Sequence, residues 1–349
     1  MSESRFAVLS DEQWEQIQPC LPSSDGRRGR PFRDSRQIVE GIVYRYRTGI
    51  PWRDLPRERF GPWQTVWKRH RRYAADGTWD HVLQQLLATA DAAGKISWDV
   101  SVDATITRAH QHASNTTRPE QDMGAGANHR PRGEDFVHSS LGGAREPAGH
   151  DIGGPRGGLT TKIHAVVDGN GRPLAAVVTG GQRNDGAMLI EVLAEIRVPR
   201  LGPGRPRTRP DAVLADRAYT SRINRGHLAR RGITGVIPQK RDEIAARQRR
   251  GSRGGRPPGF DAVAYKGRNV VERSFALAKQ WRGLATRYDK LALTYRAAVV
   301  LAACITWTKI KETCPSGPGV SCTRLNRGAP QYSGFWAIRL PWVLLPWRY

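Results

Sequence analysis

The chain has 349 residues, with 56 Lys and Arg against 32 Asp and Glu, and its formal net charge of +24 favours a polyanionic partner, nucleic acid first and an anionic membrane surface second. An arginine-rich composition inherited from a high-GC genome is the alternative explanation of that charge. The longest apolar run, 297–307, is too short to cross a bilayer, and the four cysteines have no CxxC spacing, so composition argues against a membrane span, a disulfide framework and a zinc site.

Residues 8–94 are predicted to form a small all-helical domain. Ser10 and Asp34 are expected to begin the first two helices, because Gln13 and Gln37 complete capping boxes with them. The third helix, WQTVWKRHRRY, follows Gly61-Pro62, and a fourth covers 78–93. In the third helix Trp63, Val66, Trp67 and His70 are expected to face the core. Six polar or basic residues remain for a partner: Gln64, Thr65, Lys68, Arg69, Arg71 and Arg72.

Compact helices with one basic member favour a helix-turn-helix type of DNA reader. Its Lys and Arg side chains would contact phosphates, while Gln64 or Thr65 could reach base edges. A helical packing domain with a solvated basic face is the alternative, because the connector at 51–56 is longer than the usual short turn. Of these two interpretations, we adopt the first, and residues 8–94 are predicted to be a DNA-binding domain.

Residues 95–311 show the pattern of a mixed sheet covered by helices, the α/β (α+β mixed sheet) class. Residues 96–103 alternate with period two, and Asp103 comes last on the polar side. A hairpin is predicted at 159–179, a helix at 184–196 and a short strand at 213–215, followed directly by Asp216. The later elements follow in order: a helix at 221–231, a strand at 233–237, a basic Gly-rich loop at 240–258, and helices at 265–279 and 291–311.

Asp103 and Asp216 are each expected to end a strand, and the two strands are predicted to be neighbours in the sheet. Ligands gather at such strand ends in α/β sheets. Residues 116–158 are predicted to be a mobile inserted loop, because they are rich in Gly, Pro, His and charge. The histidines in or near that loop lack regular spacing, which favours solvated side chains over a metal site.

The predicted helix at 265–279 carries four polar side chains within an arc of about 60° at ~100° per residue. They are Tyr265, Arg268, Glu272 and Lys279. A solvated helix face with ion pairs is the alternative reading. Two strand-end aspartates and a helical glutamate, however, match what DNA phosphodiester chemistry needs, since two Mg²⁺ ions about 4 Å apart require a few carboxylate ligands. Lys279 could then hold a phosphate, and Arg268 could do likewise or hold Glu272.

The residues of this helix match a known signature. Tyr265, Arg268, Glu272 and Lys279 fit the Y-x2-R-x3-E-x6-K pattern, so the chain resembles the DDE transposases of bacterial insertion sequences, of the insertion-sequence-five type. Asp216 within LADRAY and Asp103 within VDAT resemble the two aspartate motifs of that family. GGLTTKIHAVVD, GQRNDG, LSDEQWEQIQPCLP and GIPWRDLP also resemble its stretches, and the resemblance covers about 8–311.

The resemblance implies a ribonuclease H-like catalytic domain in which Asp103, Asp216 and Glu272 are catalytic metal ligands. The implied cofactor is Mg²⁺, with Mn²⁺ as a substitute. Tyr265, Arg268 and Lys279 would contact DNA or support the site. The implied activity is metal-dependent cleavage and strand transfer at the terminal inverted repeats of an insertion sequence.

The expected partner is double-stranded DNA, both element ends and target, bound by a homo-oligomer, and no membrane is expected. The expected location is the bacterial cytoplasm, associated with the nucleoid, since no signal peptide is recognisable. Two alternatives stay open: a catalytically silent DNA-binding derivative, and a nuclease of the same fold that cuts without joining. Residues 312–349 show no helical or strand period and are interpreted as a non-native or disordered tail, with an extra binding tail as the alternative.

Overall fold

The computed structural model of the protein describes residues 8–23, 34–114, 150–154 and 158–309. Two of the segments discussed above lie outside the described residues: most of the inserted loop at 116–158, and the tail at 312–349. The described residues belong to one compact unit.

The first two helices begin at the residues that the capping pattern predicts. In α1 (Asp11–Ile17) the Ser10 hydroxyl accepts from the Gln13 amide at 3.3 Å, and the Gln13 side chain accepts from the Ser10 amide at 3.1 Å. A short 3-10 turn, η1 (Gln18–Cys20), follows. Helix α2 (Ser35–Thr48) begins at Asp34, whose carboxylate accepts two backbone amides, and ends at Gly49 with φ 74°. The Gln37 side chain, predicted to complete a capping box with Asp34, instead donates to the Arg59 carbonyl at 3.0 Å. These caps satisfy helix-end groups that would otherwise lack partners.

The third and fourth predicted helices are α4 (Trp63–Ala75) and α5 (Thr78–Ala92). The connector before α4 contains two short helical turns that the sequence did not predict, η2 (Trp52–Asp54) and α3 (Arg57–Phe60). The buried side of α4 also differs from the prediction. It consists of Val66, Arg69, His70, Tyr73 and Ala74, while Trp63 and Trp67 are half-buried.

The sheet has the strand order β3-β2-β1-β4-β5, and a short sixth strand pairs with the end of β1. The antiparallel half consists of β1 (Asp99–Ala109), β2 (Thr160–Val167) and β3 (Pro173–Gly180). The parallel additions to β1 are β4 (Ala212–Ala215) and β6 (Thr286–Arg287), and β5 (Thr234–Val236) pairs with β4. This is the mixed sheet that the sequence predicted.

Shorter helical elements connect the strands. They are α6 (Gln111–Ser114), η4 (Asp185–Met188), α7 (Leu189–Ala194), η5 (Arg217–Tyr219), α8 (Arg222–Arg230), α9 (Arg241–Arg249) and η6 (Gly251–Gly254). The segment at 240–258, predicted to be a loop, is therefore partly helical.

The predicted helix at 265–279 consists of three successive pieces: α10 (Ala262–Tyr265), η7 (Lys266–Arg268) and α11 (Asn269–Lys279). The 3-10 turn coincides with Gly267, a residue of low helix propensity. Helices α12 (Arg282–Ala285) and α13 (Ala292–Thr308) complete the chain that the structure describes.

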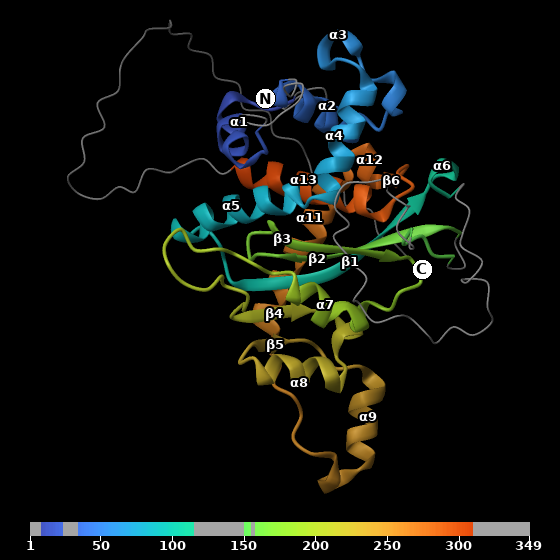
Figure 1. The fold of residues 1–349 in the computed structure, drawn as a ribbon. Helices are drawn as coiled ribbons and strands as arrows, with labels where there is room; N and C mark the ends of the chain where they lie inside the picture. The colour runs from blue at the N-terminus through green and yellow to red at the C-terminus, as the bar shows by residue number, and fades with distance from the viewer. Residues whose placement is uncertain (1–7, 24–33, 115–149, 155–157, 310–349) are drawn as a thin grey trace, which may run out of the picture. The chain divides into compact units, whose positions relative to one another are not determined.

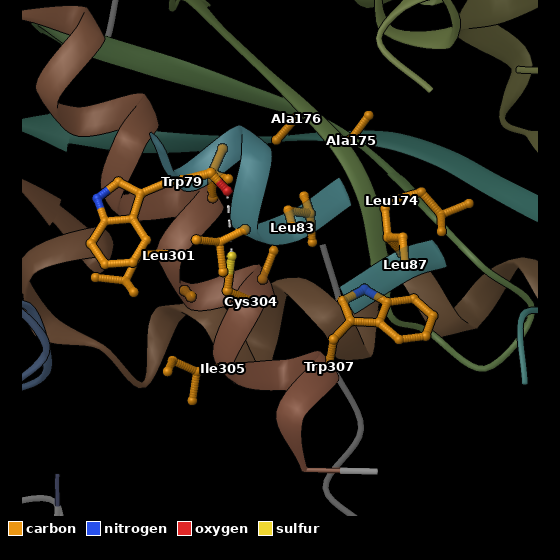
Figure 2. Close-up of a cluster of buried hydrophobic side chains, with 14 of the residues drawn as sticks. Trp79, Leu83, Leu87, Leu174, Ala175, Ala176, Leu301, Cys304, Ile305 and Trp307 are labelled. Carbon is orange, nitrogen blue, oxygen red and sulfur yellow. Dashed lines mark hydrogen bonds between the residues drawn. The ribbon is translucent and has the colours of Figure 1, made fainter. Parts of the chain in front are cut away.

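Helix α13 is the central packing element of the described residues. Its side chains pack against α5, which contributes Trp79 and Leu83, and against β3, which contributes Leu174 (Figure 2). The Trp307 indole donates to the Pro173 carbonyl at 2.7 Å. Figure 1 shows the N-terminal helices and α13 on one side of β1–β3 and α7 on the other. One hydrophobic core therefore includes both the N-terminal helices and the sheet.

A buried polar cluster forms a second connection between these parts. Both Arg45 Nη1 and the Tyr46 hydroxyl of α2 donate to Asp289 Oδ2, each at 3.1 Å. The Tyr46 hydroxyl also lies 3.0 Å from His70 Nε2 of α4. Burial lowers the pKa of His70 to about 4, so this imidazole is neutral at pH 7.

The expected fold class is confirmed: a mixed sheet with helices follows an N-terminal helical region. The division of the chain near residue 94 into two domains stays a prediction. No helix among the described residues is long and apolar enough to span a membrane.

Candidate active site

The two aspartates of the predicted site lie side by side on neighbouring parallel strands. The register pairs Val102 of β1 with Ala215 of β4. Asp103 directly follows Val102, and Asp216 directly follows Ala215. The sequence predicted that Asp103 would end its strand, and this was wrong. Strand β1 continues to Ala109 through its pairing with β2. The pairing of β1 with β4 ends at Val102, directly before Asp103. Asp103 therefore lies at a strand end only with respect to β4, and not with respect to β2.

Asp216 also organises the turn that follows it. Its Oδ1 accepts the backbone amide of Ala218 at 2.8 Å and so caps η5. This leaves its other carboxylate oxygen available for a ligand or a cation.

Asp103 faces a cation from a distant part of the chain. Its Oδ2 accepts Arg268 Nη1 at 2.8 Å, and its Oδ1 accepts the amide of Ala104 at 2.8 Å. Burial raises the pKa of Asp103 in spite of these two hydrogen bonds. The carboxylate is thus partly desolvated and depends on a positive partner.

Arg268 connects both predicted carboxylate motifs. Its Nη1 contacts Asp103, and its Nη2 donates to Glu272 Oε1 at 2.6 Å. The helical path from η7 into α11 places Arg268 and Glu272 one turn apart, on the same face. The apolar face of α11 holds it in place, because Val270 and Val271 pack against Val167 of β2.

The two outer residues of the signature lie on either side of this arginine. The Arg268 guanidinium carbon lies 6.0 Å from the Tyr265 ring centroid. Lys279 Nζ donates to the Ile106 carbonyl of β1 at 3.1 Å, and burial lowers its pKa. All four side chains of the predicted helix face therefore lie along β1 or beside a residue that contacts it.

The donor chemistry of this site fits a hard divalent cation, since Asp103, Asp216 and Glu272 offer only carboxylate oxygens. The arrangement differs from the sequence prediction in one respect. The residues that the structure describes contain no group of three or more His, Cys, Asp or Glu placed to hold a metal ion. The Arg268 guanidinium instead lies between Asp103 and Glu272 and forms an ion pair with each of them. The roles of the three carboxylates as metal ligands remain predictions.

Sequence reasoning assigned no role to a polar cluster beside the two aspartates. Lys162 Nζ lies 2.9 Å from Asp185 Oδ1, and the buried His164 ring lies 3.9 Å from the same oxygen. Burial raises the pKa of the Tyr219 phenol, and three carboxylates raise it further: Asp103, Asp185 and Asp216. Asp185 is therefore a fourth carboxylate in this neighbourhood. The stretches TKIH and RNDG contain these residues, and the alternation of Lys162 with His164 on one face of β2 was the available signal.

The six predicted DNA-contact residues of α4 do not share one environment. Gln64, Lys68 and Arg72 are exposed, while Thr65 and Arg71 are half-buried. Arg69 is buried and donates to the Tyr73 hydroxyl at 3.3 Å, so its placement on the outer face was wrong. A long arginine stem can cover apolar surface while its head finds a polar partner, which explains the inward position.

Two family profiles match the chain. Residues 9–83 match a family described as "Putative transposase of IS4/5 family", and residues 96–307 match the transposase DDE domain. An uncharacterised protein of Sinorhizobium fredii is 38% identical over 111 residues, which cover 32% of this chain and 83% of that protein. A Burkholderia cepacia protein named "Putative transposase for insertion sequence element IS402" is 36% identical over 153 residues, 44% of this chain and 65% of that protein.

Among solved structures, the crystal structure of a pre-cleavage Mos1 transpososome is 12% identical to this chain. The alignment covers 81% of each chain, with a TM-score of 0.21. Because this TM-score is low, the structural similarity carries no argument about the family of this chain, and only the sequence profiles do. Because the second profile matches well over half of the chain, the protein belongs to the transposase DDE domain family.

Proposed function

We propose that this chain is the transposase of an insertion sequence, which binds the terminal inverted repeats of its element and cuts and joins DNA there with a divalent metal. The observation that carries the proposal is that Asp103 and Asp216 directly follow a paired position of the adjacent parallel strands β1 and β4, with Arg268 linking Asp103 to Glu272. The transposase family supports the reaction class.

Three side chains would hold the ions. Asp103, Asp216 and Glu272 are the proposed ligands of Mg²⁺, or of Mn²⁺ in its place. Bound divalent ions would activate the attacking hydroxyl and stabilise the leaving oxygen. The protein supplies the fixed frame: β1 and β4 position the aspartates, and the packed face of α11 positions Glu272.

Arg268 would have to release at least one of its two carboxylates for these oxygens to bind an ion. Its guanidinium is then free to contact a DNA phosphate, for which its planar donor pattern is suited. Lys279, already beside β1, provides a second cation on the same side. Tyr265 would support Arg268 through ring contact.

Sequence recognition is assigned to α4. Its exposed Gln64 can reach base edges, while Lys68 and Arg72 can contact phosphates. Thr65 and Arg71 are half-buried and would contribute at the rim of this surface. The partner is duplex DNA from both the element ends and the target, bound by a homo-oligomer.

The proposal is tested by incubating the protein with labelled duplexes that carry the inverted repeats flanking its gene. With Mg²⁺, we expect strand cleavage at the repeat ends and joined products with a second duplex. Cleaved but never joined DNA would favour a nuclease of the same fold. Binding without cleavage in either Mg²⁺ or Mn²⁺ would favour a silent DNA-binding derivative.

A further inference from the structure

A basic helical segment extends beyond the edge of the sheet. We name residues 240–256, which contain α9 and η6, the arm. The arm follows β5, the edge strand of the sheet, and Figure 1 shows α9 outside β5 and α8, on the side away from β1. None of the residues of α9 is buried. The residues of α9 are exposed or at most half-buried, so packing against the described residues covers only part of the arm.

The arm is nevertheless a folded element. After α9, η6 turns back so closely that a Cβ on Gly254 would lie 2.3 Å from the Arg247 carbonyl oxygen. The Arg247 guanidinium in turn donates to the side chain of Gln239, the residue directly before the arm. A glycine at this approach and a side-chain bond along the helix together fix the fold-back.

The charge of the arm is divided along its length. It contains seven basic and two acidic residues, and both acids, Asp242 and Glu243, lie in the first turn of α9. From Arg247 onward every charged residue is an arginine. Four of these are exposed and make no ion pair with any described residue: Arg249, Arg250, Arg253 and Arg256. Such a cluster on a protruding element repels itself unless an anion is bound.

The base of the arm is bound to the loop that carries Asp216. Glu243 Oε2 accepts the hydroxyl of the buried Thr220 at 3.0 Å, four residues after Asp216. Arg225 of α8 donates both to the Thr220 carbonyl at 3.3 Å and to the Ile237 carbonyl at 2.7 Å. These contacts fix the direction of the arm relative to the candidate active site.

We propose that the arm is a second DNA-contact surface, separate from α4, that binds the phosphate backbone of duplex DNA through Arg249, Arg250, Arg253 and Arg256. This inference rests on the proposed function, and it assigns a partner to a surface that the candidate active site does not include. Exposed arginines without acidic neighbours match the charge of a phosphate backbone, and contacts to phosphates carry no sequence information. The contacts at Thr220 would then hold the bound duplex at a fixed position relative to Asp216.

The test compares two triple variants of the full chain. In the arm variant Arg249, Arg250 and Arg253 are changed to Gln. In the control variant the exposed Arg197, Arg200 and Arg205 of the connector before β4 are changed to Gln, with the same loss of charge. Binding to a duplex with the element end and to a random duplex is measured by fluorescence anisotropy over a series of salt concentrations. Circular dichroism of each variant checks folding, which the exposed positions should leave intact.

The arm variant should lose about 2 to 3 units from the slope of log K against log salt, and it should lose them on both duplexes, because each phosphate contact contributes about 0.9. The control variant should keep the parent's slope. An arm variant that matches the parent, or a control that falls as far as the arm variant, overturns the inference while leaving the proposed function in place. A parent chain that binds neither duplex overturns both.

Discussion

Arg268 offers a direct test of the candidate site through stability rather than catalysis. In the metal-free protein, Arg268→Gln removes the cation that contacts Asp103 and Glu272. The Asp103 side chain is 21% exposed and that of Arg268 is 17% exposed, so their bond is a partly buried charged hydrogen bond, worth about 1.5 to 3 kcal/mol. The Glu272 side chain is 55% exposed, and its pair adds only about 0.3 to 0.5 kcal/mol.

The expected loss is therefore about 2 to 3.5 kcal/mol, which for a chain of this size is a fall in melting temperature of roughly 3 to 5 °C. Mg²⁺ should reverse much of the loss, because an ion on the three carboxylates replaces the missing positive charge and stabilises the folded state by mass action. Differential scanning calorimetry of parent and variant, with and without Mg²⁺, measures both effects.

Arg36 provides a matched control. It also contacts two carboxylates, Asp11 at 2.6 Å and Glu40 at 3.0 Å in an i,i+4 pair, but Asp11 is 81% exposed. The Glu40 side chain is 16% exposed, but its partner Arg36 is 34% exposed, so this i,i+4 pair contributes about 0.3 to 0.5 kcal/mol and the exposed Asp11 pair about 0 to 1 kcal/mol. Arg36→Gln should therefore cost roughly 1 kcal/mol, and Mg²⁺ should not change that loss. If Arg268→Gln melts like Arg36→Gln, or if Mg²⁺ raises the melting temperature of both equally, the reasoning about this site is refuted.

Four further variants have distinct expected outcomes. Asp216→Asn should abolish cleavage of end-bearing DNA and leave duplex binding close to that of the parent; cleavage at the parent's rate would exclude Asp216 as a ligand. Changing Lys68 and Arg72 to Gln should flatten the salt dependence of binding by about two units, whereas Arg69→Gln should instead lower the melting temperature, because Arg69 is buried. The pKa of His70 is about 4 in the folded chain, below its unfolded value of about 6.5, so its stabilising effect is complete above pH 6.5 and is lost as the pH falls towards 4. Between pH 7 and pH 4.5, the free energy of unfolding measured with urea should fall by about 2 kcal/mol more for the parent than for His70→Gln. An equal fall in both proteins would contradict this role of His70.

The sequence predicted those features that depend on local pattern. The capping residues Ser10 and Asp34 gave the helix starts, and period-two alternation gave the strand that carries Asp103. A carboxylate after a short buried strand predicted the position of Asp216, and the register of β1 with β4 confirms that the two aspartates are neighbours.

Contacts between distant segments could not be predicted in the same way. Helical periodicity places Arg268 beside Glu272, but the bond to Asp103 spans 165 residues and depends on how α11 packs on the sheet. The same limit applies to Arg69, because periodicity does not show whether a basic side chain on the edge of a helix turns inward to Tyr73. The cluster of Lys162 and Asp185 likewise forms only when β2 and η4 come together.

The packing of α13 against both α5 and β3 fixes the N-terminal helices to the sheet without a flexible linker. If α4 recognises the element end, the distance between the recognised bases and the bond that is cut is then fixed by the protein. One added base pair moves the bond by about 3.4 Å along the duplex and rotates it by about a tenth of a turn. We therefore expect the cut to remain a constant number of base pairs from the recognised sequence, and a five-base-pair insertion, about half a helical turn, to place the natural bond on the wrong face of the duplex.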